Sequence, residues 1–84
     1  VKGREFVVQE SQLDTNHHVN NGQYVRMAMN QIELKPVKEL RVEYKKQALL
    51  GDVIVPVICE QENEIFVSLD DEAGKAYAVV QFKF

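Results

Sequence analysis

The sequence predicts an α+β domain with the element order strand, helix and then four strands. Helical periodicity occurs in one stretch, residues 20–33, whereas residues 38–84 consist of β-branched or alternating runs separated by turn signals. Strands that follow one another through short turns favour antiparallel pairing. A single helix with a broad apolar face needs a sheet to bury that face. We therefore expect one antiparallel sheet packed against one helix.

The first two elements lie on either side of a polar loop. The segment Arg4–Glu10 places Phe6-Val7-Val8 between polar neighbours, which predicts a strand. The helix is expected to begin at Asn20 or Asn21, because either can supply the N-cap oxygen. We expect it to end at Leu34-Lys35-Pro36, since the residue before a proline is disfavoured in the helical conformation. Its apolar arc comprises Tyr24, Val25, Met27, Ala28, Met29 and Ile32.

Four strands are expected in the rest of the chain, over residues 38–48, 53–59, 64–69 and 75–84. The first alternates apolar and charged side chains, which is typical of a sheet with one buried face. Gly51-Asp52 and Asp70–Gly74 predict turns between strands. Pro56 lies inside the second of these strands and cannot donate a ladder hydrogen bond, so it indicates an edge position or a bulge.

Composition is typical of a small globular domain. The 84 residues are 45% hydrophobic and 27% charged, enough for one core, although association often helps at this size. The net charge of −3 argues against nucleic-acid binding, whereas a local Lys/Arg patch would still admit an acidic partner. No apolar run approaches the roughly 20 residues of a membrane span, and we expect no signal peptide. The single Cys59 is expected to be buried and inert, and it indicates a reducing cytoplasm.

The candidate site is the loop that leads into the helix. Asp14, Asn16 and His18 occur at alternate positions, so their side chains project to one side of an extended loop. The helix that follows directs its unpaired N–H groups and the positive end of its dipole toward this loop. Such a site would stabilise the negative charge that a carbonyl oxygen gains during acyl transfer.

Each polar residue of this loop also has a structural interpretation. His18 carries a proton or orients a carbonyl, or else backbone groups satisfy its ring. Asp14 is a nucleophile or a base for water, or else a turn former bonded to nearby backbone. Asn16 positions the carbonyl or a water, or else forms an Asx turn. His17 falls on the other side of the alternation, where we expect a surface residue. We expect no metal and no cofactor, because adjacent histidines point apart and no Cys or Glu ligand is suitably spaced.

Residues 14–24 form the pattern Asp-x-Asn-x-His-Val-Asn-Asn-x-x-Tyr, which resembles the motif in the C-terminal hotdog domain of acyl-acyl carrier protein (acyl-ACP) thioesterases. The similarity continues through residues 40–48 and Gly51-Asp52. Members carry two hotdog repeats, whereas one motif and one set of strands are present here, so the chain is similar to the second repeat alone. The resemblance implies a single hotdog fold over residues 1–84 and hydrolysis of a fatty acyl-ACP thioester.

The resemblance also implies roles for individual residues. Catalytic roles fall on Asp14, Asn16, His18 and Gln47, and substrate-binding roles on Asn20, Asn21 and Tyr24. Gln47 and Ala48 stand where the family usually has a glutamate and, in plant members, a cysteine. A glutamine cannot accept a proton as a base, so Asp14 or another carboxylate would have to activate the water. Met27 lies near a position where the family often has tryptophan, which would alter the acyl pocket.

The expected partners follow from the same resemblance. The substrate would be the thioester of an acyl carrier protein, and a two-fold homodimer or pairing with a second hotdog half would cover the helix and the sheet edge. Two alternatives stay open. One is an acyl-CoA thioesterase, because CoA shares the pantetheine arm. The other is a catalytically silent hotdog module that pairs with another half or binds an acyl ligand, an interpretation that Gln47 supports.

Overall fold

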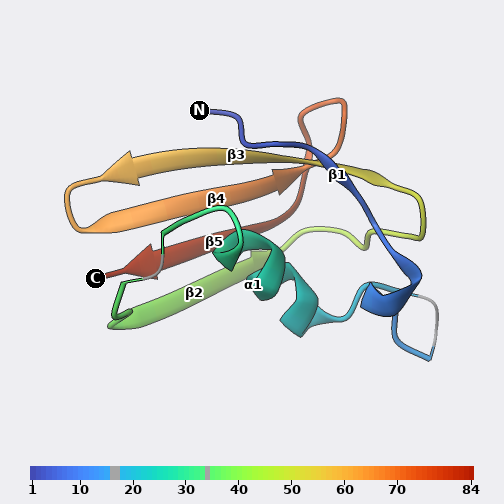
Figure 1. Cartoon of the computed structure of the whole chain (residues 1–84), viewed down its shortest axis with the longest axis horizontal. Coiled ribbons are helices and arrows are strands. Elements are labelled where there is room, and N and C mark those ends of the chain that lie inside the picture. Colours follow the sequence, from blue (N-terminus) through green and yellow to red (C-terminus); the bar gives the residue numbers. More distant parts are fainter. Residues whose placement is uncertain (16–17, 34) are drawn as a thin grey trace.

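A computed structural model describes residues 1–15, 18–33 and 35–84. It contains, in chain order, β1 (Phe6–Val7), a 3-10 turn (Glu10–Gln12), α1 (Asn21–Met29), β2 (Glu39–Tyr44), β3 (Val53–Gln61), β4 (Glu64–Asp70) and β5 (Ala76–Lys83). The strands form one antiparallel sheet in the order β1-β3-β4-β5-β2 (Figure 1). The predicted α+β class and element order are confirmed. In the described part of the chain, no helix is long and apolar enough to cross a membrane.

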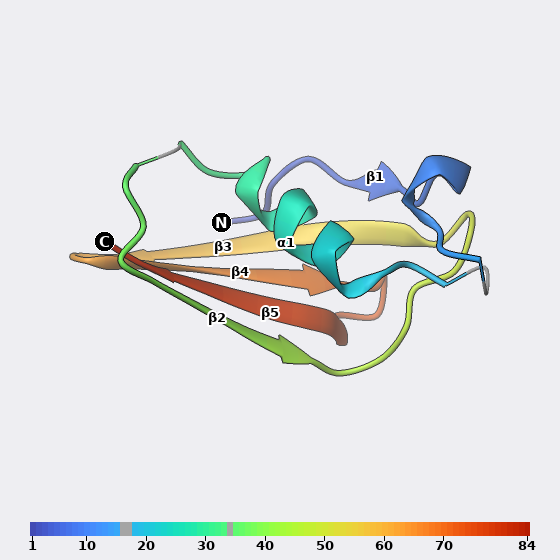
Figure 2. The same cartoon turned by 90° about the horizontal axis from the view of Figure 1, so that it is seen from below.

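The helix lies across one face of the curved sheet (Figure 2). Its buried side chains are Tyr24, Met27 and Ala28. The sheet contributes alternate residues to the same core, because successive side chains of a strand point to opposite faces. Phe82 of β5, for example, lies between Leu40 of β2 and Ile65 of β4 in the register. The core is thus a single layer between α1 and the sheet.

The central strands carry both polar and apolar side chains on the face turned away from α1. The Nζ atom of Lys83 lies 3.3 Å from Glu39 Oε2, and Gln81 Nε2 donates to Glu64 Oε2 at 2.8 Å. Such half-exposed pairs contribute little to stability individually. The fully buried side chains of β4 and β5, such as Val67, Val80 and Phe82, lie on the opposite face, which is the face that the helix covers.

The helix begins as predicted but ends earlier. Asn20 is the N-cap, with its Oδ1 accepting the Gly22 N–H at 2.8 Å. The helix ends at Met29, before the predicted Leu34-Lys35-Pro36, because the N–H groups of Gln31 and Ile32 bond three residues back to Ala28 and Met29. These tighter bonds replace the α-helical hydrogen bonds, so the helix ends before the position at which Pro36 would have ended it. Leu34 lies outside the described residues.

The first strand is shorter than the predicted 4–10 segment. Only Phe6–Val7 pairs with β3, and the chain then enters the 3-10 turn, where Gln9 N–H donates to Gln12 Oε1 at 2.8 Å. The N-terminal residues instead extend the contact along β3, with Gly3 N–H donating to the Pro56 carbonyl at 2.8 Å.

The prediction of an edge strand or a bulge at Pro56 is wrong. β3 is the second strand of the sheet, and the register shift lies between Leu69 and Asp70 of β4. In an antiparallel ladder the N–H and C=O of one residue point to the same side. The Pro56 carbonyl points to Gly3, so the missing N–H faces that side as well and the pairing with β4 is kept.

The chain leaves the sheet after Tyr44, four residues before the predicted end of this strand. The N–H groups of Lys45 and Lys46 both donate to the Tyr77 carbonyl, at 2.9 and 3.2 Å, which ends the regular ladder. Residues 45–52 then cross to the entrance of α1 before β3 begins. The positive φ of Gly51, 84°, confirms the turn predicted there. This crossing brings residues from two distant parts of the sequence together.

Candidate functional site

Asp14 closes the loop that precedes the helix. Its N–H donates to the His18 carbonyl at 2.8 Å, and its Oδ1 accepts the His18 N–H at 3.2 Å. A bridge between Leu13 and Val19 continues this narrow loop. Asp14 is therefore a turn former here, as one of its two interpretations proposed, and its carboxylate lies at the backbone of His18. The predicted Asn16 and His17 lie outside the described residues.

Two of the first three helical N–H groups already have partners at the N-cap. Gly22 N–H donates to the Asn20 side chain, and Gln23 N–H donates to the Asn20 carbonyl at 2.9 Å. Asn21 is the first residue of α1. If the first turn stabilises an oxyanion, the Asn21 N–H and the helix dipole would therefore contribute most of the effect.

The loop pairs with the segment that follows β2. His18 forms an antiparallel bridge with Leu49, and Val19 N–H donates to the Ala48 carbonyl at 3.3 Å. If the same register continued for one more residue, Gln47 would lie opposite Asn20.

Burial shows which side chains of this pairing face outward. Val19 and Ala48 are 3% and 0% exposed, so they face the core. Because side chains alternate in paired extended segments, their neighbours His18, Asn20, Gln47 and Leu49 face the other way, and we call these four residues the mouth face. Asn20, Gln47 and Leu49 are exposed and His18 is half-buried, and the neighbouring Lys46 and Leu50 are exposed as well. The structure thus brings the His18-Val19 part of the motif beside Ala48 and Leu49 at the helix entrance, and alternation predicts that Gln47 faces the same side as His18.

Tyr24 lies behind the mouth face rather than on it. Its side chain is 2% exposed, and its hydroxyl oxygen accepts the Ala48 N–H at 2.8 Å. Burial raises the pKa of the Tyr24 hydroxyl above its ordinary value. The substrate-binding role implied for Tyr24 stays a prediction, and its observed contact is with the backbone beneath Gln47 and Leu49.

Asp52 and Tyr77 form a second support that the motif did not indicate. Asp52 Oδ2 accepts the Leu49 N–H at 2.8 Å and the Tyr77 hydroxyl at 3.3 Å. Burial, and then the nearby Asp52 charge, raise the pKa of Tyr77 to about 12. The Gly51-Asp52 turn was the sequence signal at this position, but it carried no information about the distant Tyr77.

Cations adjoin the mouth face on its β2 side. Lys46, next to Gln47, forms an ion pair with Asp71, and its Nζ lies 4.7 Å from the centre of the Tyr77 ring. The hydrogen bond from Lys46 lowers the pKa of Asp71 to about 2. Lys45 pairs with Glu43 at 2.7 Å. Each of these lysines is thus paired with a carboxylate.

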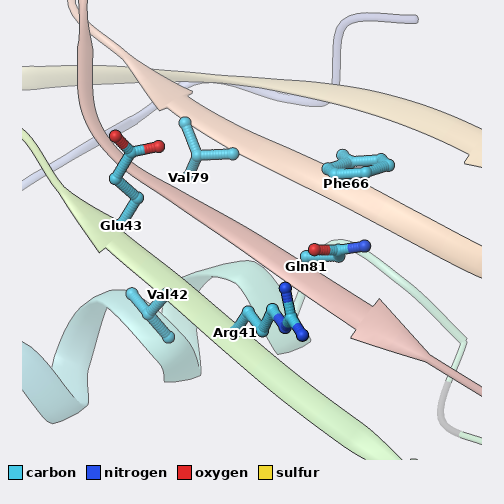
Figure 3. A pocket seen from close by; sticks show the side chains of 6 residues that line it. All are labelled: Arg41, Val42, Glu43, Phe66, Val79 and Gln81. Atoms are coloured by element: carbon cyan, nitrogen blue, oxygen red, sulfur yellow. The ribbon is translucent and has the colours of Figure 1, made fainter.

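A hollow of about 280 Å³ lies elsewhere, between β2, β4 and β5. Figure 3 shows Phe66, Val79 and Gln81 on the side of the sheet away from α1, with Arg41 and Glu43 beside them. The mouth face is therefore separate from this hollow.

Cys59 is exposed, so the prediction of a buried cysteine is wrong. It lies on β3, in the part of that strand where the residues from Cys59 to Gln61 are all exposed. Among the described residues, no three His, Cys, Asp or Glu side chains are grouped so as to hold a metal ion.

The observed arrangement, one helix across a curved antiparallel sheet, is the hotdog fold. The chain belongs to the acyl-ACP thioesterase C-terminal domain family, whose model matches residues 1–84. A solved structure of an acyl-ACP thioesterase from Bacteroides thetaiotaomicron VPI-5482 shares the fold, with a TM-score of 0.88 and 20% identity. The match covers 96% of this chain and 36% of that one, so this chain spans about a third of its length. A search of curated proteins finds no match.

Proposed function

We propose that residues 1–84 are a single hotdog domain, equivalent to the C-terminal repeat of an acyl-ACP thioesterase, that takes part in hydrolysis of a fatty acyl thioester in the cytoplasm. The products would be a free fatty acid and the thiol of the carrier protein. The observation that carries this proposal is the pairing of His18 with Leu49 beside the start of α1, from which we infer that His18, Asn20 and Gln47 share the mouth face. The family to which the chain belongs supports the same chemistry.

The chemistry needs a polarised carbonyl and an activated water. The Asn21 N–H and the dipole of α1 would stabilise the oxyanion. His18 would hold the thioester or the water, and Asn16 would assist it. Asp14 would orient His18 through the backbone bonds that close the loop, or act on the water directly. Tyr24 would support substrate binding from beneath.

Hydrolysis of matched thioesters tests this function. We expect the protein to release dodecanoate from dodecanoyl-ACP faster than from dodecanoyl-CoA. His18→Ala should lower kcat/KM by about 10²-fold, since it removes a group that positions or transfers a proton. Glu62→Ala, in the turn between β3 and β4, is the control and should leave the rate unchanged. The fatty acid should be measured, because the exposed Cys59 would itself react with a thiol reagent.

Two other outcomes of this experiment would contradict the proposed function. Faster hydrolysis of dodecanoyl-CoA would favour the acyl-CoA thioesterase. A rate at background on both substrates would favour the silent module, for which Gln47 is the supporting feature.

An apolar strip at the edge of the sheet supports pairing with a second hotdog half. Met29, Val37, Leu40 and Tyr44 are large hydrophobic residues that are all at least one-third exposed. Leu40 and Tyr44 belong to the edge strand β2, and Val37 lies just before it. A hollow of about 360 Å³ lies between Met29, Val37 and Leu40. An edge strand also presents unpaired backbone groups. We propose that a second copy of this chain, or another hotdog half, covers this strip.

Substitution within the strip tests the pairing. At tens of micromolar, sedimentation equilibrium should show a dimer of the unmodified chain and a monomer of Leu40→Glu, because the buried charge would lack a partner. Val7→Glu on the opposite edge is a matched control, since Val7 is 44% exposed and Leu40 is 45% exposed. This control should remain dimeric. A monomeric unmodified chain, or equal effects of the two substitutions, would contradict self-association through this strip.

A further inference from the structure

Residues 45–52 have no strand of their own, yet hydrogen bonds hold them near the start, in the middle and at the end of the segment. At the start, the Lys45 and Lys46 N–H groups donate to Tyr77 of β5. In the middle, both backbone groups of Ala48 are bonded, its N–H to Tyr24 and its carbonyl to Val19. The mouth face therefore rests on a backbone that is fixed from behind.

The end of this segment is closed by Asp52. Its carboxylate accepts the Leu49 N–H, while its own N–H donates to the Leu49 carbonyl at 3.0 Å. The same carboxylate oxygen accepts the Tyr77 hydroxyl, which ties the turn to β5. The Val8 N–H donates to the Asp52 carbonyl at 2.9 Å, which ties it to the N-terminal segment as well.

We propose that Tyr24 and Asp52 are positioning residues for hydrolysis: they hold the backbone at Ala48 and Leu49 so that Gln47 and Leu49 face His18 and Asn20. This inference rests on the proposed function. Neither side chain faces the mouth, because Tyr24 is buried beneath Ala48 and the Asp52 carboxylate is occupied by Leu49 and Tyr77. Each acts through a backbone N–H. Loss of either contact would let the segment shift, and displacements near 1 Å can cost about 10²-fold in rate.

The test joins amide hydrogen exchange with steady-state kinetics on dodecanoyl-ACP. Tyr24→Phe keeps the ring but removes the acceptor for Ala48, and Asp52→Ala removes the acceptor for Leu49. We expect amide exchange to accelerate at Ala48 in the first variant and at Leu49 in the second. In both, kcat should fall by about tenfold or more while KM changes less, because the substrate still binds but the reacting groups are misplaced.

Two further variants separate positioning from a general loss of stability. Asp52→Asn retains an acceptor oxygen and should recover slow exchange at Leu49 and most of kcat. Ser68→Ala removes a different side-chain hydrogen bond, that to Asp70 on β4, and should alter neither exchange at Ala48 and Leu49 nor kcat.

The outcomes distinguish this inference from the proposed function. If the unmodified protein hydrolyses the thioester but Tyr24→Phe and Asp52→Ala leave exchange or kcat unchanged, the positioning role is overturned and the proposed function stands. If the unmodified protein gives no hydrolysis, the proposed function fails and the positioning role fails with it. Failure of Asp52→Asn to restore kcat above Asp52→Ala would also overturn the role assigned to the Asp52 oxygen.

Discussion

Replacing Gln47 with glutamate is expected to raise the rate of thioester hydrolysis by about 10²-fold. A carboxylate at this position can accept a proton from the attacking water, whereas a carboxamide cannot, and general-base assistance is typically worth about 10²–10⁴-fold. We place the gain at the lower end because Gln47 is exposed and its new carboxylate would be well solvated. The measurement is kcat on dodecanoyl-ACP between pH 4 and 8, where the gain should decrease toward pH 4 as the new carboxylate is protonated, since the pKa of a free glutamate is about 4.

Gln61→Glu is the matched control for this substitution. It makes the same chemical change at an exposed position at the far end of β3, so the rate should stay at the level of the unmodified protein. Asp14→Asn completes the comparison, because the carboxamide oxygen can still accept the His18 N–H while the negative charge is lost. It should remove most of the unmodified activity. Unchanged hydrolysis in Gln47→Glu together with its loss in Asp14→Asn would identify Asp14 as the working carboxylate and Gln47 as a positioning group.

Replacing Phe82 with alanine is expected to give the largest loss of stability in the described sheet. The ring is 1% exposed and lies between Leu40 and Ile65 on the face that α1 covers. Truncation of a buried phenylalanine costs about 3–5 kcal/mol. For a domain of this size each kcal/mol lowers Tm by about 4–8 °C. Urea unfolding at one fixed protein concentration would measure the change, since pairing would make stability depend on concentration.

Phe66→Ala provides the comparison on the opposite face. Phe66 is half-buried and lies in the outer hollow, so its truncation should cost about 1 kcal/mol. The loss of stability in Phe82→Leu should lie between the losses in the two alanine variants. This variant keeps the comparison possible if Phe82→Ala does not fold. Equal losses for Phe82→Ala and Phe66→Ala would contradict the assignment of the core to the helix face.

The elements that sequence predicted well are those set by near neighbours. The Asn20 cap depends on a side chain and an N–H group that are two residues apart. The turn at Gly51 has a positive φ, which glycine adopts without strain. The β4 and β5 strands lie at residues 64–70 and 76–83, close to the predicted 64–69 and 75–84, because turn residues mark their ends. The motif loop and its resemblance to acyl-ACP thioesterases were also readable, because the motif is contiguous.

Some of the predictions that failed depended on parts of the chain that are distant in sequence. The early end of the strand after the helix reflects competition by the Tyr77 carbonyl, and Pro56 is accommodated because Gly3 supplies the neighbouring backbone. Cys59 was predicted to be buried from its apolar neighbours, whereas its end of β3 is exposed.

For the candidate site, local sequence specified the loop and the helix entrance, while tertiary structure decided which residues join them. A helix and a strand separate His18 from Leu49 in the sequence, and only the folded sheet brings these two residues into a bridge. Tyr24 and Ala48 are 24 residues apart, and Asp52 and Tyr77 are 25 apart. No periodicity or spacing encodes such contacts, because they form only when burial of the apolar face folds the sheet around α1 and carries residues 45–52 to its entrance.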